Sequence, residues 1–333
     1  MTGGQVVVVT GASSGVGRAT VRAFASEGGR IGLIARGQEG LEATRREVEA
    51  RGGEALVLPG DVADAAFLKG AAEQVEETFG PIDVWVNNAM TSVFTPVWDA
   101  EPEEFERVMQ VCYLGQVNGT LAVLPRMMAR DRGVIVSVGS ALAYRSIPYQ
   151  APYCAAKHAV KAFFEGLRTE LIHEGTQVQV VQVHLPAMNT PQFRLCKSRL
   201  PRQLKPFPPI FQPELAAEAI LHVARHPRRE MYVGWATNRV IYGQKVAPRA
   251  ADWFLARNGF DGQQTDEPAD PERPHNLWEP VSGDHGAHGV FDEEAVGTSP
   301  QLWASERRGW LGLAAAGLLS LGAAVALARQ TLA

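Results

Sequence analysis

The chain is poor in cysteine, and the three that it has, Cys112, Cys154 and Cys196, lie far apart in the sequence. Such spacing gives neither a disulfide framework nor the close pairs of a zinc site, and it suits a reducing compartment. An excess of positive charge is also lacking, since the formal net charge is -4 at pH 7, which argues against non-specific binding to nucleic acid. No charged segment precedes the apolar run that begins at residue 5, so we expect no secretory signal peptide.

What the chain does have is enough apolar material for a large core. Of its 333 residues, 46% are hydrophobic and 20% are charged. Such a composition is typical of a folded chain, and the length fits one α/β domain of about 250 residues with an extension, or two ordinary domains.

Apolar, β-branched runs alternate with helical patterns over the first 235 residues. This alternation predicts βαβ units, and therefore an α/β, doubly wound, Rossmann-type parallel sheet with helices on both faces. The seven expected strands are 5–10, 30–35, 54–61, 82–89, 133–140, 177–186 and 230–234. In such a sheet, ligands bind at the carboxyl ends of the strands.

A glycine-rich turn, "TGASSGVG" (10–17), follows the first expected strand and opens a helix. Glycines at Gly11, Gly15 and Gly17 permit a tight turn and a close approach of the backbone to a pyrophosphate. The helix N-terminus offers free N–H groups to that phosphate, and the hydroxyls of Ser13 and Ser14 can donate further hydrogen bonds. A plain capping turn is the alternative, but the position after the first strand of a βαβ unit favours a dinucleotide.

The second expected strand indicates which dinucleotide. An acidic residue at its end would bind the ribose hydroxyls of NAD. Here the strand ends in Ala35 and Arg36, and no acid precedes Glu39. A guanidinium can pair with a 2′-phosphate, and Arg18 adds positive potential nearby, so NADP(H) is favoured. The alternative is that Arg36 is a solvated loop residue.

Tyr153 and Lys157 are spaced to share one face of an expected helix, "APYCAAKHAV". Side chains at i and i+4 meet on a helix, and a nearby cation lowers the pKa of a phenol. The pair is therefore a candidate proton donor, although this spacing alone is common and needs support from the rest of the chain.

Taken together, these segments resemble the short-chain dehydrogenase/reductase family over about residues 5–235. Ser140 precedes Tyr153 by 13 residues, as the family pattern requires. The matching segments, in order, are "TGASSGVG", "GDV" (60–62), "NNA" (87–89), "GS" (139–140) and "YCAAK" (153–157).

The resemblance implies a role for each matching residue. Tyr153 is the expected general acid/base, Lys157 holds the nicotinamide ribose and lowers the tyrosine pKa, and Ser140 donates a hydrogen bond to the substrate oxygen. With NADP(H) favoured as cofactor by the end of the second strand, the resemblance further implies a small-molecule carbonyl or alcohol as substrate, and a homodimer or homotetramer. The residues expected to contact the cofactor are Gly11, Ser13, Ser14, Gly15, Gly17, Arg36, Asp61, Val62, Asn88, Ala89, Tyr153, Lys157 and Thr190.

Three positions depart from the family pattern, and one of them is Pro186, where the family usually has glycine. Cys112 stands where the family has a catalytic asparagine that supports proton relay, and Met90 replaces the glycine of "NNAG". An NADP-binding sensor or a membrane-tethered interaction protein with little turnover therefore remains an alternative to an oxidoreductase. We expect no metal, because the "GDHGAHG" segment (283–289) completes no ligand set.

The expected organisation is a catalytic domain over 1–245, with a lid or substrate loop at 190–213, and a C-terminal extension or arm over 246–305. Residues 306–333 are expected to form an apolar helix, in which 310–328 carry no charge. Nineteen helical residues would span about 28 Å, close to a bilayer core of about 30 Å. We favour membrane attachment with a cytoplasmic catalytic domain, and a helix packed on the enzyme or on a second subunit is the alternative.

Overall fold

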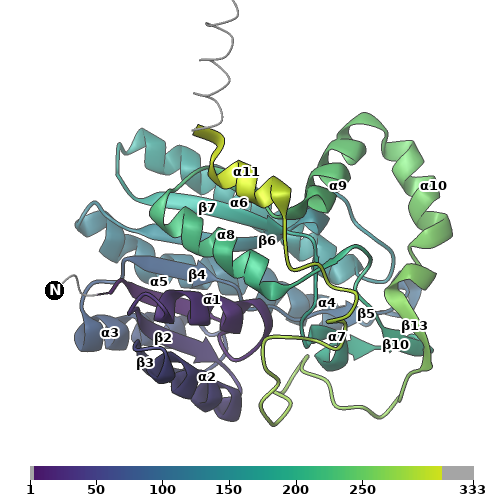
Figure 1. The fold of residues 1–333 in the computed structure, drawn as a ribbon, viewed down its shortest axis with the longest axis horizontal. Coiled ribbons are helices and arrows are strands. Elements are labelled where there is room, and N and C mark those ends of the chain that lie inside the picture. The colour runs from purple at the N-terminus through teal and green to yellow at the C-terminus, as the bar shows by residue number, and fades with distance from the viewer. Residues whose placement is uncertain (1–3, 310–333) are drawn as a thin grey trace, which may run out of the picture.

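A seven-stranded parallel sheet lies at the centre of the computed structural model, which describes residues 4–309 (Figure 1). The strand order is β12-β7-β6-β4-β1-β2-β3, and every neighbouring pair is parallel. The seven strands are β1 (Val6–Thr10), β2 (Arg30–Ala35), β3 (Glu54–Pro59), β4 (Val84–Asn87), β6 (Val134–Ser140), β7 (Gln179–Leu185) and β12 (Glu230–Tyr232).

Helices cover both faces of this sheet, because alternate residues of a buried strand point to opposite faces. Val6 and Val8 pack into one apolar core with α3, α5 and α6, whereas Val7 and Val9 pack into the other with α1, α2 and α8. The helices are α1 (Gly15–Ala25), α2 (Gln38–Ala50), α8 (Pro213–Arg225), α3 (Ala65–Phe79), α4 (Pro102–Met109), α5 (Gly115–Ala129) and α6 (Ala151–His173). The predicted doubly wound α/β fold is therefore confirmed.

The helical region over residues 102–129 is interrupted. A π-helical turn, η2 (Gln110–Leu114), separates α4 from α5 and contains Cys112. Turns of this kind are rare and often mark functional sites, because they displace one residue from the regular helical hydrogen-bond pattern.

The expected lid, 190–213, is built from short ordered pieces that share a small apolar core with Phe94 and Phe291. Glu104 of α4 holds this region through ion pairs with Lys197 (2.7 Å) and Arg199 (2.8 Å). The pieces here and nearby are β5 (Val93–Phe94), η1 (Val97–Asp99), η3 (Ala141–Ala143), β8 (Ala187–Met188), α7 (Gln192–Leu195), β9 (Lys197–Ser198), β10 (Arg202–Leu204) and β11 (Ile210–Phe211).

The C-terminal extension folds back along the sheet domain. Its β13 pairs antiparallel with β10, and residues 269–292, here named the strap, then run along the lower edge of the molecule in Figure 1 before the chain reaches α11. The elements of this part are α9 (Gly234–Val246), α10 (Pro248–Asn258), η4 (Asp261–Gln263), β13 (Gln264–Pro268) and α11 (Pro300–Glu306).

The uncharged run 310–328, expected to be a possible membrane anchor, lies outside the described residues. Within residues 4–309, no helix combines the length and the apolar character needed to cross a bilayer.

Candidate active site

A cavity of about 530 Å³ opens at the carboxyl ends of the central strands. The structure brings every predicted site residue except Gly17 to its walls. Those lining the cavity are Gly11, Ser13, Ser14, Gly15, Arg36, Asp61, Val62, Asn88, Ala89, Ser140, Tyr153, Lys157 and Thr190.

The glycine turn has the geometry that its sequence predicts. Gly11 has a φ of 68°, which favours glycine, and a Cβ added at Gly17 would lie 2.1 Å from the carbonyl oxygen of Gly11. Asn88 supports the turn by donating from Nδ2 to the carbonyl of Thr10 at 2.9 Å. Gly17 therefore acts through packing beneath the turn.

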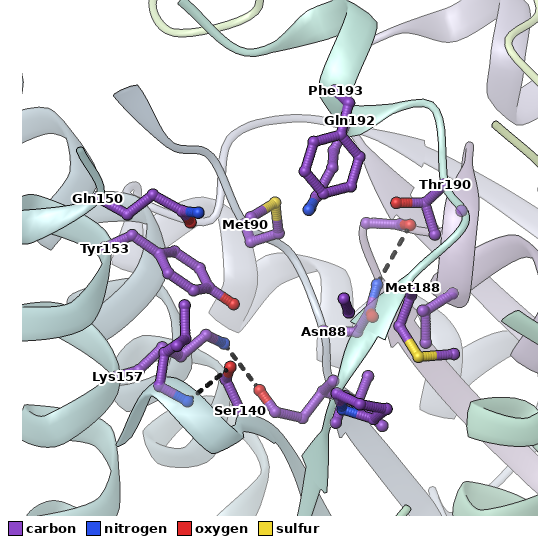
Figure 2. Close-up of a pocket in the computed structure, with 18 of the residues that line it drawn as sticks. Asn88, Met90, Ser140, Gln150, Tyr153, Lys157, Met188, Thr190, Gln192 and Phe193 are labelled. Carbon is purple, nitrogen blue, oxygen red and sulfur yellow. Dashed lines mark hydrogen bonds between the residues drawn. The ribbon is translucent and has the colours of Figure 1, made fainter. Parts of the chain in front are cut away.

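Ser140, Tyr153 and Lys157 converge at the other end of the cavity. Ser140 ends β6, and α6 carries Tyr153 and Lys157 one turn apart; Figure 2 shows the Tyr153 hydroxyl directed into the cavity, with the other two side chains beside it. Lys157 is buried, donates from Nζ to the carbonyl of Val138 at 2.8 Å, and lies 5.5 Å from the Tyr153 ring centroid.

Gln116 of α5 is a supporting residue that the sequence analysis missed. Its Nε2 donates to the same Val138 carbonyl at 3.3 Å, and its Oε1 accepts from the Ser137 hydroxyl at 2.7 Å. This buried network fixes the strand end from which Ser140 projects. A glutamine on an apolar helix gave no sequence signal, because its partners are visible only after folding.

Burial controls the protonation of the tyrosine and the lysine. It raises the pKa of Tyr153 well above its usual range, an effect increased by Cys112 and opposed by hydrogen bonding to Ser140. Burial likewise lowers the pKa of Lys157. The lowered tyrosine pKa expected from the i, i+4 pair is therefore wrong, because the cost of burying a phenolate exceeds the effect of the lysine charge.

Cys112 has a structural contact of its own. Its thiol donates to the carbonyl of Thr91 at 3.1 Å and accepts from the Thr91 N–H at 3.3 Å, and burial raises the thiol pKa. The cysteine thereby links the π-helical turn to the loop that follows β4. Asn118, six residues further on, instead donates to the carbonyl of Val62 at 3.1 Å and holds the loop after β3.

The strap closes the glycine-turn end of the cavity. Arg36 donates to the carbonyls of Asn276 and Trp278, the latter at 2.6 Å, and burial lowers its pKa. The Gly15 N–H at the start of α1 donates to the carbonyl of Gly286 at 3.0 Å. Two of the residues predicted to contact a dinucleotide thus also hold the strap.

Two further arginines extend this contact. Arg18 is buried and pairs with Asp284 of the strap and with Glu47 of α2 at 2.9 Å. Arg107 donates from Nε to the Leu277 carbonyl at 2.9 Å and pairs with Asp61. The expected extension or arm, 246–305, thus holds the cavity edge through four backbone carbonyls, which accept from Arg36, Gly15 and Arg107.

Behind Ser140, a buried histidine is held uncharged. The Nε2 atom of His184 lies 3.3 Å from the hydroxyl oxygen of Tyr144. That hydroxyl donates to the Glu230 carboxylate at 3.1 Å. Burial lowers the His184 pKa to about 4, although Glu230 opposes this shift and Lys161 and Lys157 add to it.

This histidine makes stability depend on pH. Because its folded pKa lies below its unfolded value, the unfolded chain gains a proton first as pH falls, and stability is lost below about pH 6.5. Between about pH 7 and pH 5 we expect a loss of about 2 kcal/mol in the free energy of unfolding, measured with urea. His184→Gln should reduce this dependence of the unfolding free energy on pH. An identical dependence in the parent and the variant would contradict the low pKa assigned to His184.

The family model described as short chain dehydrogenase matches residues 5–199. This chain belongs to the short-chain dehydrogenase family. Membership agrees with the parallel sheet and with the seven-strand order, so the predicted family is confirmed.

Individual relatives of this short-chain dehydrogenase extend the match further along the chain. The uncharacterized oxidoreductase YxnA of Bacillus subtilis is 32% identical over 84% of this chain and 80% of its own length. The fatty acyl-CoA reductase of Acinetobacter baylyi is 30% identical over 68% of this chain and 75% of its own. The structure of an alcohol dehydrogenase from Thermococcus sibiricus, complexed with 5-hydroxy-NADP, is 28% identical, with a TM-score of 0.59 over 69% of this chain and 94% of that one.

Proposed function

We propose that this short-chain dehydrogenase interconverts a carbonyl and an alcohol with NADP(H). The observation that carries the proposal is one cavity with Ser140, Tyr153 and Lys157 at one end and the glycine turn at the other. An interaction scaffold needs no such convergence of a buried lysine, a phenol and a hydroxyl.

The residues divide the chemistry in a simple way. A bound nicotinamide would supply or accept the hydride. In reduction, the Tyr153 hydroxyl gives its proton to the carbonyl oxygen, and the raised pKa keeps that proton on the phenol at neutral pH. Ser140 donates a second hydrogen bond to the same oxygen, and the Lys157 ammonium stabilises the phenolate that remains. Oxidation reverses these steps.

NADP(H) is favoured over NAD(H) because the guanidinium of Arg36 lines the cavity where β2 ends. A planar guanidinium can hold a strap carbonyl and still pair with a phosphate, since it has five N–H donors. The similar alcohol dehydrogenase bound to 5-hydroxy-NADP supports this choice.

The substrate end of the cavity favours an apolar molecule. Its walls come from the lid, from η3 and the loop after it, and from α9 and α10, and they are mostly hydrocarbon and aromatic. The residues are Leu142, Ile147, Phe193, Leu195, Phe207, Val240, Phe254 and Leu255. The name of the Acinetobacter relative, a fatty acyl-CoA reductase, agrees with a long apolar carbonyl compound.

Hydride transfer from NADPH to a panel of soluble and lipidic aldehydes and ketones tests the proposal. We expect turnover with apolar carbonyl compounds, which is measured as the loss of NADPH absorbance. NADPH binding without turnover across the panel would instead support the sensor alternative, which the position of Cys112 motivates.

We further propose the domain division of the sequence analysis, a catalytic domain over 1–245 and an extension over 246–305, with a homodimer or homotetramer as the assembly. Membrane attachment through residues 310–328, with the catalytic domain in the cytoplasm, is also a proposal, and it rests on the uncharged run in the sequence.

The anchor is tested by fractionation. The full chain should pellet with membranes and resist a high-salt wash, because an apolar segment is held by burial in hydrocarbon and not by charge. A chain ending at Gly309 keeps α11 and should stay in the supernatant with its activity intact. A full chain that remains in the supernatant at both low and high salt would disprove the anchor.

A further inference from the structure

Helices α9 and α10 present an exposed aromatic face beside the cavity. In Figure 1, α10 lies at the edge of the molecule, away from the sheet, whereas α9 packs against the sheet domain and α11. In α10, Leu255 is the buried residue, so this helix has little packing against the described chain. We name the aromatic face by its exposed side chains, which are Trp235, Tyr242, Val246, Trp253, Phe254 and Phe260.

On α9, the spacing of these residues follows a single stripe. Trp235, Arg239, Tyr242 and Val246 are separated by four, three and four residues, which places them on one side of the helix. Val246 is 84% exposed, and Trp253 on α10 is 68% exposed. Large apolar groups this open to water usually mark a surface that another body covers.

The charges around the aromatic face are mostly positive, although the whole chain is negative. Residues 234–260 contain four basic side chains and one acidic side chain, Asp252, which pairs with Arg145 at 2.7 Å. Three of the basic groups lie over aromatic rings: Arg239 over Trp235 at 4.9 Å, Lys245 over Tyr242 at 6.0 Å and Arg257 over Trp253 at 5.9 Å. Such a combination of rings and cations suits the headgroup layer of an anionic bilayer, where rings enter the interface and long cationic side chains reach the phosphates.

The aromatic face is continuous with the mouth of the cavity. Trp235, Arg239 and Phe254 belong both to this surface and to the cavity lining. On the other side, α11 packs against α9, and the uncharged run 310–328 follows α11 in the sequence. A bilayer touching the aromatic face would therefore meet the cavity entrance.

We propose that the α9–α10 aromatic face docks on an anionic lipid bilayer, and that an apolar carbonyl substrate passes from the bilayer into the cavity between these helices. The second part rests on the proposed function, whereas the docking itself requires no turnover. Docking also explains why Trp235 and Phe254 at the cavity mouth stay 45% and 54% exposed, since a bilayer would cover the apolar surface that the protein core does not.

Hydrogen exchange of the full chain, read by mass spectrometry, tests the docking. Vesicles of phosphatidylcholine with phosphatidylglycerol should slow exchange over residues 235–260, and vesicles of phosphatidylcholine alone or added salt should reduce this protection. Vesicle binding without protection there would show that another segment alone holds the bilayer, and it would overturn the proposal. Protection that grows with protein concentration in the absence of lipid would identify the face as an interface between two copies of the chain, which also overturns it.

A variant links docking to substrate entry. Trp253 lies on the aromatic face but not in the cavity lining, so Trp253→Glu removes a ring and adds a repelled charge without touching the site. We expect about a tenfold higher KM for a long-chain carbonyl compound presented in anionic vesicles, with kcat unchanged and a short soluble carbonyl compound unaffected. The control is Trp98→Glu, since Trp98 is 80% exposed but lies on η1. Equal effects of both variants, or no effect of Trp253→Glu, would overturn the proposed entry route. If the parent chain shows no turnover, that result counts against the proposed function, and the hydrogen-exchange experiment alone tests the docking.

Discussion

Tyr153→Phe is expected to lower kcat by about 10²- to 10⁴-fold while the dissociation constant for NADPH stays nearly unchanged. The phenol is the group that can protonate a substrate oxygen at this end of the cavity, and phenylalanine keeps the ring and its packing. Because the hydroxyl proton is needed in the transition state and not for cofactor binding, the loss should appear in kcat.

The control for this variant is Tyr113→Phe. Tyr113 is partly buried against the same apolar core as Tyr153, yet it lies outside the cavity lining. The Tyr113→Phe variant should therefore have parent-like turnover. Both variants should bind NADPH as the parent does, measured by fluorescence. Parent-like turnover of Tyr153→Phe would refute the catalytic assignment, and equal losses in the two variants would point to a packing defect.

Arg36→Ala is expected to lower the affinity for NADPH by roughly ten- to a hundredfold, and the affinity for NADH much less. A charge-assisted hydrogen bond to the 2′-phosphate contributes about 1.5–3 kcal/mol, and NADH has no phosphate at that position. The structure adds a second effect, because the same guanidinium holds the strap through the Asn276 and Trp278 carbonyls. Loosening the strap should weaken both cofactors alike.

Asp284→Asn separates these two effects. It weakens the ion pair between the strap and Arg18 and leaves Arg36 in place. Faster release of both cofactors from Asp284→Asn, with an unchanged preference for NADPH, is the expected result in stopped-flow measurements. If Arg36→Ala weakens NADPH and NADH to the same extent, Arg36 serves the strap and does not recognise the phosphate.

The sheet and the cavity-lining residues were accessible from the sequence because each rests on a local pattern. The β-branched run of β1, the glycines after it and the i, i+4 pair on α6 each restrict the backbone over fewer than about ten residues. Parallel topology then brings strand ends together, so residues as distant as Gly11 and Ser140 line one cavity without any further information.

What the sequence could not indicate depends on contacts between distant segments. The strap is held largely through its backbone carbonyls, at Asn276, Leu277, Trp278 and Gly286, and a carbonyl is the same in every residue. No residue type or spacing in the sequence indicates such a contact. The raised pKa of Tyr153 was missed for a related reason, since burial is a property of the folded environment and not of the i, i+4 pair.

The strap also sets an order of events during synthesis. Gly15 and Arg36 leave the ribosome early, but their partners Gly286 and Trp278 follow some 240 to 270 residues later. A nascent chain can thus form β1, α1 and β2 long before the strap closes the glycine-turn end of the cavity. Contacts so distant in sequence form slowly, because loop closure costs entropy before the contact forms. Tight retention of a nucleotide would accordingly be among the last properties the new protein acquires, and a chain broken off before residue 276 would fold its sheet but release the nucleotide quickly.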